Sequence, residues 1–284
     1  MYDRAQLAAL DAVVGTGSFE AAARALEVTP SAVSQRVRAL ERSAGAVLVR
    51  RTRPCAATEH GERLVRLARQ VAALEADLDD TPPTSLPVAV NADSVATWFP
   101  AALARAAART DVALDVHVDD ETRTADLLRA GRVTAAVTCA PRPVQGCRSV
   151  VLGALRYRAV AAPSLLATAP DPGLGRLPLV LFDTTDDIPA RLARRAGVRS
   201  LTATPHLLPS TDGYLAAIRA GLGWGAVPEV QAAPLLDAGD LVDVADGHHV
   251  DVALHWQHWR TMSGPLQTLT DAVVATAAER LHPA

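Results

Sequence analysis

The sequence predicts an α/β protein in which a small helical module precedes a larger region of alternating strands and helices. Up to about residue 80, apolar residues recur at the spacing of an amphipathic helix in several segments. From residue 85 onward, short apolar runs alternate with helical segments, which indicates an α/β region with a largely parallel sheet. With 284 residues, 49% hydrophobic and 21% charged, the chain is long enough for two or three globular domains.

Three short helices joined by tight turns are expected in the first module. Residues 4–14 carry apolar residues at helical spacing, and the glycine-containing stretch 15–18 ends that helix. Ser18 can cap a second helix over 19–26, and Thr29 can cap a third helix that begins at Pro30. This order is typical of a helix-turn-helix module, whose last helix enters the major groove of DNA.

The helix from Pro30 has two different faces. Val33, Val37 and Leu40 form an apolar stripe at i, i+4 and i+7. The opposite face carries hydroxyl, amide and guanidinium groups, which read base edges and bind phosphates. An ordinary amphipathic surface helix would show the same two faces, but the basic segment that follows favours DNA binding.

A small hairpin with a basic tip, a wing, is expected next. Residues 47–49 are strand-like, and the chain returns through residues 55–57. Although the net charge is −3, six arginines and one acid lie between Arg36 and Arg53. A wing aims such arginines at the minor groove or at phosphates. The candidate DNA-binding residues are Thr29, Pro30, Ser31, Ser34, Gln35, Arg36, Arg38, Arg50, Arg51 and Arg53.

A long helix is expected from Thr58, its candidate N-cap, to about Asp79. Its apolar positions alternate in steps of three and four, which is the pattern of a helix–helix seam. The seam spans about two heptads, so we interpret it as a dimerisation helix that needs help from the attached domains. The alternative is a helix that packs onto its own module. The seam positions are Leu64, Leu67, Val71, Leu74 and Leu78.

Residues 79–85 have the composition of a linker, and α/β alternation follows it. We therefore expect a winged helix-turn-helix domain (1–58), a linker or dimerisation helix (59–80) and a ligand-binding region (85–284). This last region divides into one subdomain of about 85–162 with 264–284 and another of about 163–263. Small ligands bind in the cleft of such a pair, at the carboxyl ends of the strands. Strands are expected at 86–91, 113–118, 134–138, 155–161, 179–182, 204–208, 224–227 and 250–257, and helices at 94–109, 122–131, 188–196, 212–221 and 264–281.

The sequence shows no sign of secretion, membrane insertion or catalysis. The first residues lack a basic segment followed by an apolar run, and no stretch of about 18 apolar residues could span a bilayer. Three scattered cysteines indicate a reducing cytoplasm and no disulfide framework. His255 and His258 lie beside tryptophans in a strand-like segment without metal-ligand spacing. No GxSxG, HExxH, P-loop or CxxC motif occurs, so we expect neither an enzyme, a metal nor a cofactor.

Two stretches, SFEAAARALEVTPSAVSQRVRALE (18–41) and VRRTRPCAATEHGERL (49–64), resemble the winged helix-turn-helix signature of LysR-type transcriptional regulators. The second half is similar to the branch that responds to arginine and lysine and controls export of basic amino acids. Matching stretches include VNADSVATWFP (90–100), DDETRTADLLRAGRVTAAVT (119–138) and STDGYLAAIRAGLGWGAVP (210–228). The resemblance implies a two-subdomain, periplasmic-binding-protein-like α/β effector domain. It also implies double-stranded promoter DNA as a partner, a homodimer or dimer of dimers, and RNA polymerase as a further partner.

A basic amino acid presents a carboxylate, an α-ammonium and a distal cation. Backbone N–H groups at a helix N-terminus suit the carboxylate, and the cations need acids because a buried unpaired charge is costly. Each acid at a strand end could instead be a solvated loop carboxylate or a helix cap. The candidate effector residues are Asp93, Ser94, Asp119, Asp120, Glu121, Thr138, Asp183, Thr211 and Asp212, with Asp186, Asp187 and Ser210 beside them.

The expected function is a regulator whose promoter binding is controlled by a basic amino acid, L-lysine or L-arginine, and that governs an amino-acid exporter. The acids do not distinguish lysine from arginine. Two alternatives stay open: a LysR-type regulator of another small effector, and an architectural protein that bends DNA without an effector. The sequence predicts neither the operator, the target gene nor the direction of regulation.

Overall fold

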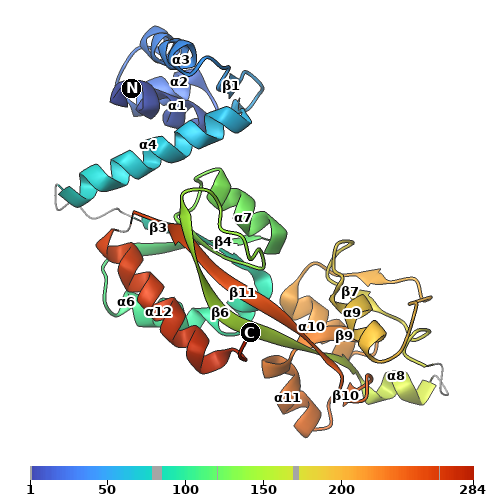
Figure 1. The fold of residues 1–284 in the computed structure, drawn as a ribbon. Helices are drawn as coiled ribbons and strands as arrows, with labels where there is room; N and C mark the ends of the chain where they lie inside the picture. Colours follow the sequence, from blue (N-terminus) through green and yellow to red (C-terminus); the bar gives the residue numbers. More distant parts are fainter. Residues whose placement is uncertain (1, 79–84, 120, 169–172, 262) are drawn as a thin grey trace. The chain divides into compact units, whose positions relative to one another are not determined.

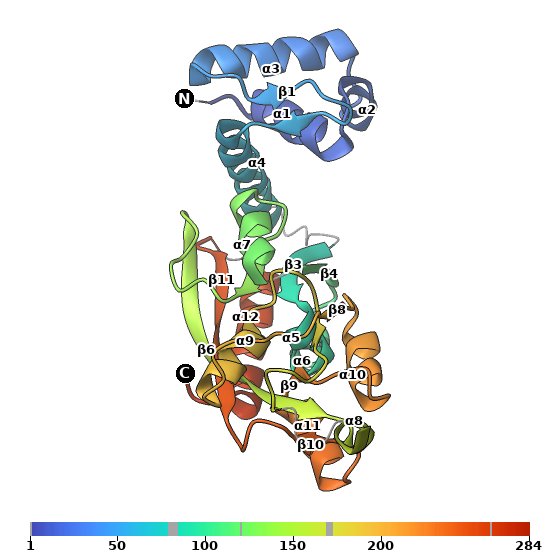
Figure 2. The same cartoon turned by 90° about the vertical axis from the view of Figure 1, so that its right-hand side faces the viewer.

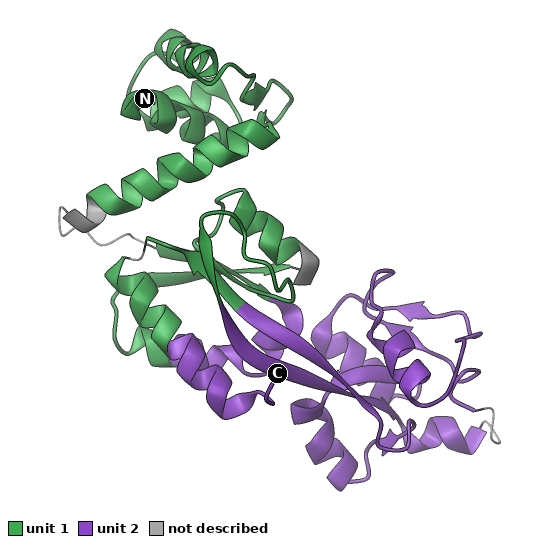
Figure 3. Cartoon of the chain, viewed as in Figure 1, with its two compact units in different colours: residues 1–90, 105–149, 256–271 green, residues 91–104, 150–255, 272–284 purple. Residues whose placement is uncertain are grey.

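The structure, a computed structural model, describes residues 2–78, 85–119, 121–168, 173–261 and 263–284 (Figures 1 and 2). They form two compact units (Figure 3). Unit 1 comprises residues 1–90, 105–149 and 256–271, and unit 2 comprises residues 91–104, 150–255 and 272–284. The strands β6 (Cys147–Ala161) and β11 (His249–Trp259) contribute residues to both units. The subdomain boundaries expected near 162 and 264 stay a prediction, and the linker expected at 79–85 lies almost wholly outside the described residues.

The first part of unit 1 is a winged helical module. The expected N-caps form: Ser18 Oγ accepts a hydrogen bond from the Ala21 N–H, and Thr29 Oγ1 accepts one from the Ala32 N–H. Gly17 follows the first helix with φ of 74°, a left-handed conformation that glycine adopts without strain. The elements are α1 (Arg4–Thr16), α2 (Phe19–Ala25), α3 (Pro30–Ala44), β1 (Val49–Arg50), β2 (Ala56–Ala57) and α4 (Glu59–Leu78).

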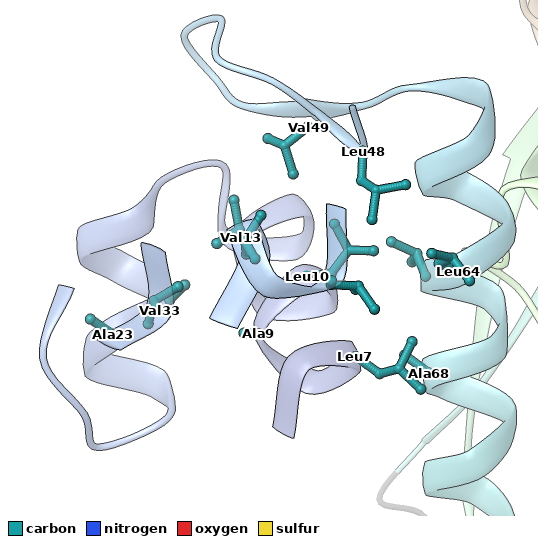
Figure 4. Close-up of a cluster of buried hydrophobic side chains, with 14 residues drawn as sticks. Leu7, Ala9, Leu10, Val13, Ala23, Val33, Leu48, Val49, Leu64 and Ala68 are labelled. Atoms are coloured by element: carbon teal, nitrogen blue, oxygen red, sulfur yellow. The ribbon is translucent and has the colours of Figure 1, made fainter. Parts of the chain in front are cut away.

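An apolar cluster holds this module together (Figure 4). Leu10 and Val33 are fully buried in it, as is Leu48 at the base of the wing. Burial of each such side chain stabilises the fold by about 1.5–3 kcal/mol. Helix α4 joins the same cluster through Leu64, a position of the expected seam, whereas Leu74 is 46% exposed. The first half of α4 therefore packs on its own module, and dimerisation through the second half stays a prediction.

The rest of unit 1 is built on parallel strand pairing. β3 (Ser85–Asn91) is parallel to β5 (Ala135–Thr138), with Val88 opposite Ala135. The strand order is β11, β5, β3 and β4 (Ala113–Asp119), so β4 lies at the edge. Helix α7 (Glu121–Arg129) follows β4, and its Leu128 is buried against the sheet residues. Gln257 of β11 anchors the loop after β5 through hydrogen bonds with the backbone of residues 140, 142 and 144.

In unit 2 the expectation of a largely parallel sheet is wrong. β6 pairs antiparallel with both β9 and β10, although β7 and β8 pair in parallel. The alternation of strands and helices indicates crossover connections, but the direction of a strand depends on pairing with residues far along the chain. The elements are α5 (Ala92–Ala96), α8 (Pro163–Thr168), β7 (Val180–Leu181), α9 (Ile188–Arg195), β8 (His206–Leu207), α10 (Thr211–Arg219), β9 (Gly225–Pro228), α11 (Glu229–Asp237) and β10 (Val242–Asp243).

The helix expected over 94–109 is two helices, α5 and α6 (Phe99–Ala107). Pro100 lacks a backbone N–H and is tolerated only in the first turn, so a new helix begins beside it. At the break, Trp98 Nε1 donates a hydrogen bond to Ser94 Oγ over 3.0 Å. Trp98 and Trp224 are 3% and 0% exposed, so both are core residues. Helices α8 and α11 were not expected, whereas the closing helix α12 (Gly264–Arg280) was.

Candidate functional site

Helix α3 presents the expected polar face to solvent. Gln35 and Arg38 are exposed, and Ser34 and Arg36 are half-buried. Ser31 is also exposed, and its Oγ lies 2.9 Å from Thr29 Oγ1. Short side chains near the start of the helix allow its backbone to approach base edges, and the longer polar groups beyond them can reach bases or phosphates. The arrangement is that of a recognition helix.

The wing arginines have three different surroundings. The Arg50 guanidinium donates from Nε and Nη2 to the Ala57 carbonyl oxygen, over 3.2 and 3.0 Å, across the hairpin. The Arg51 guanidinium lies 5.0 Å from the centre of the Phe19 ring, a cation–π contact. Arg53 is exposed at the tip. Arg50 thus stabilises the hairpin itself, whereas Arg51 and Arg53 extend the basic surface beside α3.

Three residues fix the wing on the module. Glu41 of α3 accepts a hydrogen bond at Oε1 from the Leu48 N–H, over 3.0 Å. Thr58 Oγ1 donates to the Val47 carbonyl and accepts from the Gly61 N–H. A Cβ on Gly61 would lie 2.1 Å from the Leu48 carbonyl oxygen, so only glycine allows α4 to approach the wing. The sequence indicated Thr58 as a cap; the roles of Glu41 and Gly61 were missed, although Glu41 is the one acid among the arginines of 36–53.

In unit 2, Asp93 lies in the first turn of α5, and a tyrosine holds its carboxylate. Tyr157 Oη of β6 donates a hydrogen bond to Asp93 Oδ2 over 2.6 Å. Asp93 as a whole is half-buried. Burial raises the pKa of Asp93 above its usual value, and the hydrogen bond from Tyr157 opposes part of the rise. The predicted neighbour Ser94 is buried and bound to Trp98.

A second acid of unit 2, Asp186, also has a raised pKa. It lies in the loop before α9, where its carboxylate accepts hydrogen bonds from the backbone N–H groups of Phe182 and Ile188, over 3.3 and 3.1 Å. Burial raises the pKa of Asp186, and the negative charge of Asp93 adds to the rise. Burial also raises the pKa of Tyr214, with further contributions from Asp186 and Asp93. Unit 2 thus brings together two acids far apart in the sequence.

These two acids differ from others in unit 2 because no arginine or histidine of the described ranges forms an ion pair with them. Arg156 binds Asp251 through two hydrogen bonds, of 2.8 and 3.0 Å, and the pKa of Asp251 is lowered mainly by them. Burial of Asp243 acts to raise its pKa, but hydrogen bonds, chiefly from Arg158, lower it overall. Among the described residues, the Asp93 and Asp186 carboxylates therefore lack an ion pair that would offset their burial.

The predicted residues of unit 1 have other surroundings. Asp119 ends β4 and lies 3.8 Å from Arg123. Thr138 ends β5, is 1% exposed, and its Oγ1 accepts a hydrogen bond from the Ala140 N–H. Asp120 and the side chain of Glu121 lie outside the described part of the structure. Among the residues that are described, no group of three or more histidine, cysteine or acidic side chains could hold a metal ion.

The remaining predicted residues of unit 2 lie at local turns. Asp183 Oδ1 accepts hydrogen bonds from the backbone of Thr185 and Asp186, so this acid shapes the loop that holds Asp186. Thr211 and Asp212 open α10, whose N-cap is Ser210. Asp212 is exposed.

Tyr157 and Tyr214 were missed as candidate site residues. Both are buried, and Tyr214 Oη donates to the Val180 carbonyl and accepts from the Ala226 N–H. The signal was available, because the chain has only three tyrosines and the other, Tyr2, precedes the first helix. A buried tyrosine requires a hydrogen-bond partner, and an acid is a strong one.

Comparisons with known proteins agree with both halves of this arrangement. The family described as "Bacterial regulatory helix-turn-helix protein, lysR family" matches residues 5–62, and "LysR substrate binding domain" matches residues 80–278. A lysine export transcriptional regulatory protein, LysG of Corynebacterium efficiens, is 45% identical, over 95% of this chain and 96% of that protein.

Two solved structures are similar over almost the whole chain. The crystal structure of ArgP from Mycobacterium tuberculosis has a TM-score of 0.92 and 43% identity, and covers 98% of each chain. Full-length LysG of Corynebacterium glutamicum with the bound effector Arg has a TM-score of 0.85 and 41% identity, and covers 99% of this chain and 100% of that one. The winged module, the α/β effector domain and these matches together place the chain in the LysR family, as a transcriptional regulator and not an enzyme.

Proposed function

We propose that this regulator binds promoter DNA under the control of a basic amino acid, L-lysine or L-arginine, and that it governs an amino-acid exporter. The observation that carries the proposal is that two acids of unit 2, Asp93 and Asp186, form no ion pair among the described residues, whereas Asp243 and Asp251 of the same unit each bind an arginine. The names of relatives, a lysine export regulator and a regulator with bound Arg, support the same ligand class. The ligand is an effector and not a cofactor.

The chemistry of the pair explains the preference for a cation. Burial raises the pKa of both carboxylates, and the charge of Asp93 adds to the rise at Asp186. An ammonium or guanidinium group bound beside them would offset the burial of both and the repulsion at Asp186. Tyr157 fixes the orientation of Asp93, so less conformational freedom is lost when the ligand binds. A neutral amino acid of similar length would leave the acids uncompensated.

We assign Asp93, Asp186, Tyr157 and Tyr214 as the core of the effector site. We keep the other candidates as proposed effector contacts. They are Ser94, Asp119, Thr138, Asp183, Thr211 and Asp212, together with Asp120 and Glu121, whose side chains lie outside the described part of the structure. For DNA, we assign base contacts to Ser34 and Gln35, and phosphate or minor-groove contacts to the arginines of α3 and the wing.

The assembly and its setting belong to the proposal as well. We propose a homodimer or dimer of dimers, because one winged module reads one half-site and regulators of this architecture bind paired half-sites. Leu74, exposed on α4, supplies an apolar surface for the partner helix. RNA polymerase is the further partner that a promoter-bound regulator would contact, and the compartment is the cytoplasm. No described helix is long and apolar enough to cross a membrane.

Calorimetric titration of the full chain with L-lysine, L-arginine, L-histidine and norleucine tests the ligand class. Binding of lysine or arginine, with none of norleucine, is the expected result. Asp93→Asn and Asp186→Asn should each weaken that binding by about 30-fold or more, as loss of one partner of a buried charge pair does. The matched control is Asp240→Asn, which removes an exposed acid paired with Arg219 and should leave affinity unchanged.

Binding of none of the four compounds would refute the basic amino-acid assignment and favour another small effector. Binding of arginine or lysine with unchanged affinity in both aspartate variants would refute the site but not the ligand. DNA binding that ignores every small molecule would favour the architectural alternative.

A further inference from the structure

One arginine of the long helix α4 contacts both functional halves of unit 1. Arg69 Nε lies 2.7 Å from Asp11 Oδ1, in helix α1 of the DNA-binding module. Arg69 Nη1 lies 2.7 Å from the carbonyl oxygen of Gly131, just after α7 in the effector region. The Arg69 and Asp11 side chains are 26% and 33% exposed, so solvent screens this ion pair only in part. A single guanidinium therefore joins α1 to the end of α7.

A second arginine strengthens the attachment to α7. Arg66, one turn earlier in α4, is only 8% exposed and donates from Nη1 to the Arg129 carbonyl oxygen over 3.2 Å. The carbonyl groups at the end of a helix lack partners within the helix and carry its negative dipole end. Arg66 thus binds the last residue of α7, where a cation is favourable, and Arg69 binds the chain two residues further on. Ala73 of α4 packs against the apolar cluster that contains Leu128 of α7.

Gly131 allows this close approach. Its φ is +68°, and a Cβ there would lie 2.8 Å from both Cα and Cβ of Arg66. Such contacts do not occur between real side chains, so a side chain at 131 would push α4 away from α7. Gly146 is a matched residue in the same unit, because its φ is +84° and its Cβ would meet nothing within 4 Å.

We propose that Arg69, supported by Arg66, is the positioning residue that couples the effector region to the DNA-binding module within one chain. Helix α7 begins at Glu121, two residues after the candidate effector residue Asp119. Arg66 binds the carbonyl of its last residue, Arg129, and Arg69 binds that of Gly131 just beyond it. A shift of α7 on effector binding therefore either carries α4 and α1 with it or breaks the Gly131–Arg69–Asp11 bridge. The coupling to effector rests on the proposed function, whereas the bridge itself does not.

Hydrogen exchange tests the bridge without any effector. In the full chain, Arg69→Gln and Asp11→Asn should both increase exchange of the amides at 130–132, which close the end of α7. Asp11 lies in α1 and pairs with Arg69, so an effect of Asp11→Asn at 130–132 is expected to pass through Arg69. Arg63→Gln, which removes an exposed pair with Glu59 on the same helix, is the control and should change nothing at 130–132. Unchanged exchange at 130–132 in both Arg69→Gln and Asp11→Asn would overturn the proposal.

The second measurement is the ratio of DNA affinities with and without L-arginine or L-lysine. In wild type this ratio should lie in the range of typical allosteric coupling, about 5–150-fold. Arg69→Gln and Gly131→Ala should reduce it several-fold toward one while each separate affinity persists, and Arg63→Gln and Gly146→Ala should keep it. If Arg69→Gln keeps the wild-type ratio of DNA affinities, the coupling role of Arg69 is overturned. If wild type ignores both amino acids, the proposed function fails, and the hydrogen-exchange result still decides whether the bridge exists.

Discussion

Gly61→Ala tests whether the wing is fixed by close contact with α4. In an unhindered helix, replacing glycine with alanine stabilises by up to about 1 kcal/mol, because glycine loses more backbone entropy on folding. At position 61 the new Cβ would lie 2.1 Å from the Leu48 carbonyl oxygen, where real contacts stay above 3.0 Å. The wing base and α4 must therefore separate by at least 3.0 − 2.1 = 0.9 Å.

The two effects have opposite signs, and their sizes decide the outcome. Overpacking of this kind costs about 1–3 kcal/mol. The separation also stretches the hydrogen bond from the Thr58 N–H to the Leu48 carbonyl, now 2.9 Å, and loss of such a bond costs about 0.5–1.5 kcal/mol. After subtracting the helix-propensity gain of about 1 kcal/mol, we expect net destabilisation of roughly 0.5–3.5 kcal/mol.

Thermal unfolding of the DNA-binding module within the full chain measures this change. For a module of this size, each kcal/mol lowers the midpoint by about 4–8 °C. The matched control is Gly15→Ala, a helical glycine of α1 whose Cβ would meet nothing within 4 Å, and it should be neutral or stabilising. The variant should also bind DNA more weakly at temperatures where it is folded, because the wing is displaced. A Gly61→Ala midpoint equal to or above that of Gly15→Ala would refute the reasoning.

Two further predictions concern DNA and pH. Gln35→Ala should relax base preference by about 1–3 kcal/mol at one position, whereas Arg53→Ala should weaken binding to specific and random DNA alike and lower the slope of affinity against salt by about one. Filter binding at several salt concentrations distinguishes these two effects. Identical losses on both DNAs for both variants would contradict this division. Because burial raises the folded-state pKa of Asp93 above its unfolded value of 3.8, the ligand-free protein should lose stability as pH rises from that value through the folded pKa. Asp93→Asn should remove this part of the pH dependence and raise the denaturant midpoint at neutral pH, which unfolding across this pH range measures. In the wild type, affinity for lysine or arginine should fall as acid protonates the site, which calorimetry measures. A lower midpoint for Asp93→Asn at neutral pH would argue against an unpaired buried carboxylate.

The recognition helix illustrates what local sequence determines. Thr29 caps it, and Pro30 occupies the first turn, where no N–H is needed. The stripe of Val33, Val37 and Leu40 is buried, as its spacing predicts. Caps and helical periodicity involve residues within a few positions of one another, so they can be read from sequence without knowing the fold. The resemblance to LysR-type regulators then extended this reading to the effector half, and the family is confirmed.

Tertiary structure decided which side chains meet. Asp93 was among many acids at strand ends, and only folding places its charge near Asp186 and under the Tyr157 hydroxyl. Arg50 and Arg69 look like any other arginine in the sequence, yet one closes the wing and the other bridges α1 to the end of α7. Tertiary pairing also decided that β9 and β10 run antiparallel to β6. The contacts of Asp93 and Arg69 join residues about 60 positions apart, and that of Arg50 depends on the hairpin having formed. Their energies depend on burial and distance, which no local pattern records.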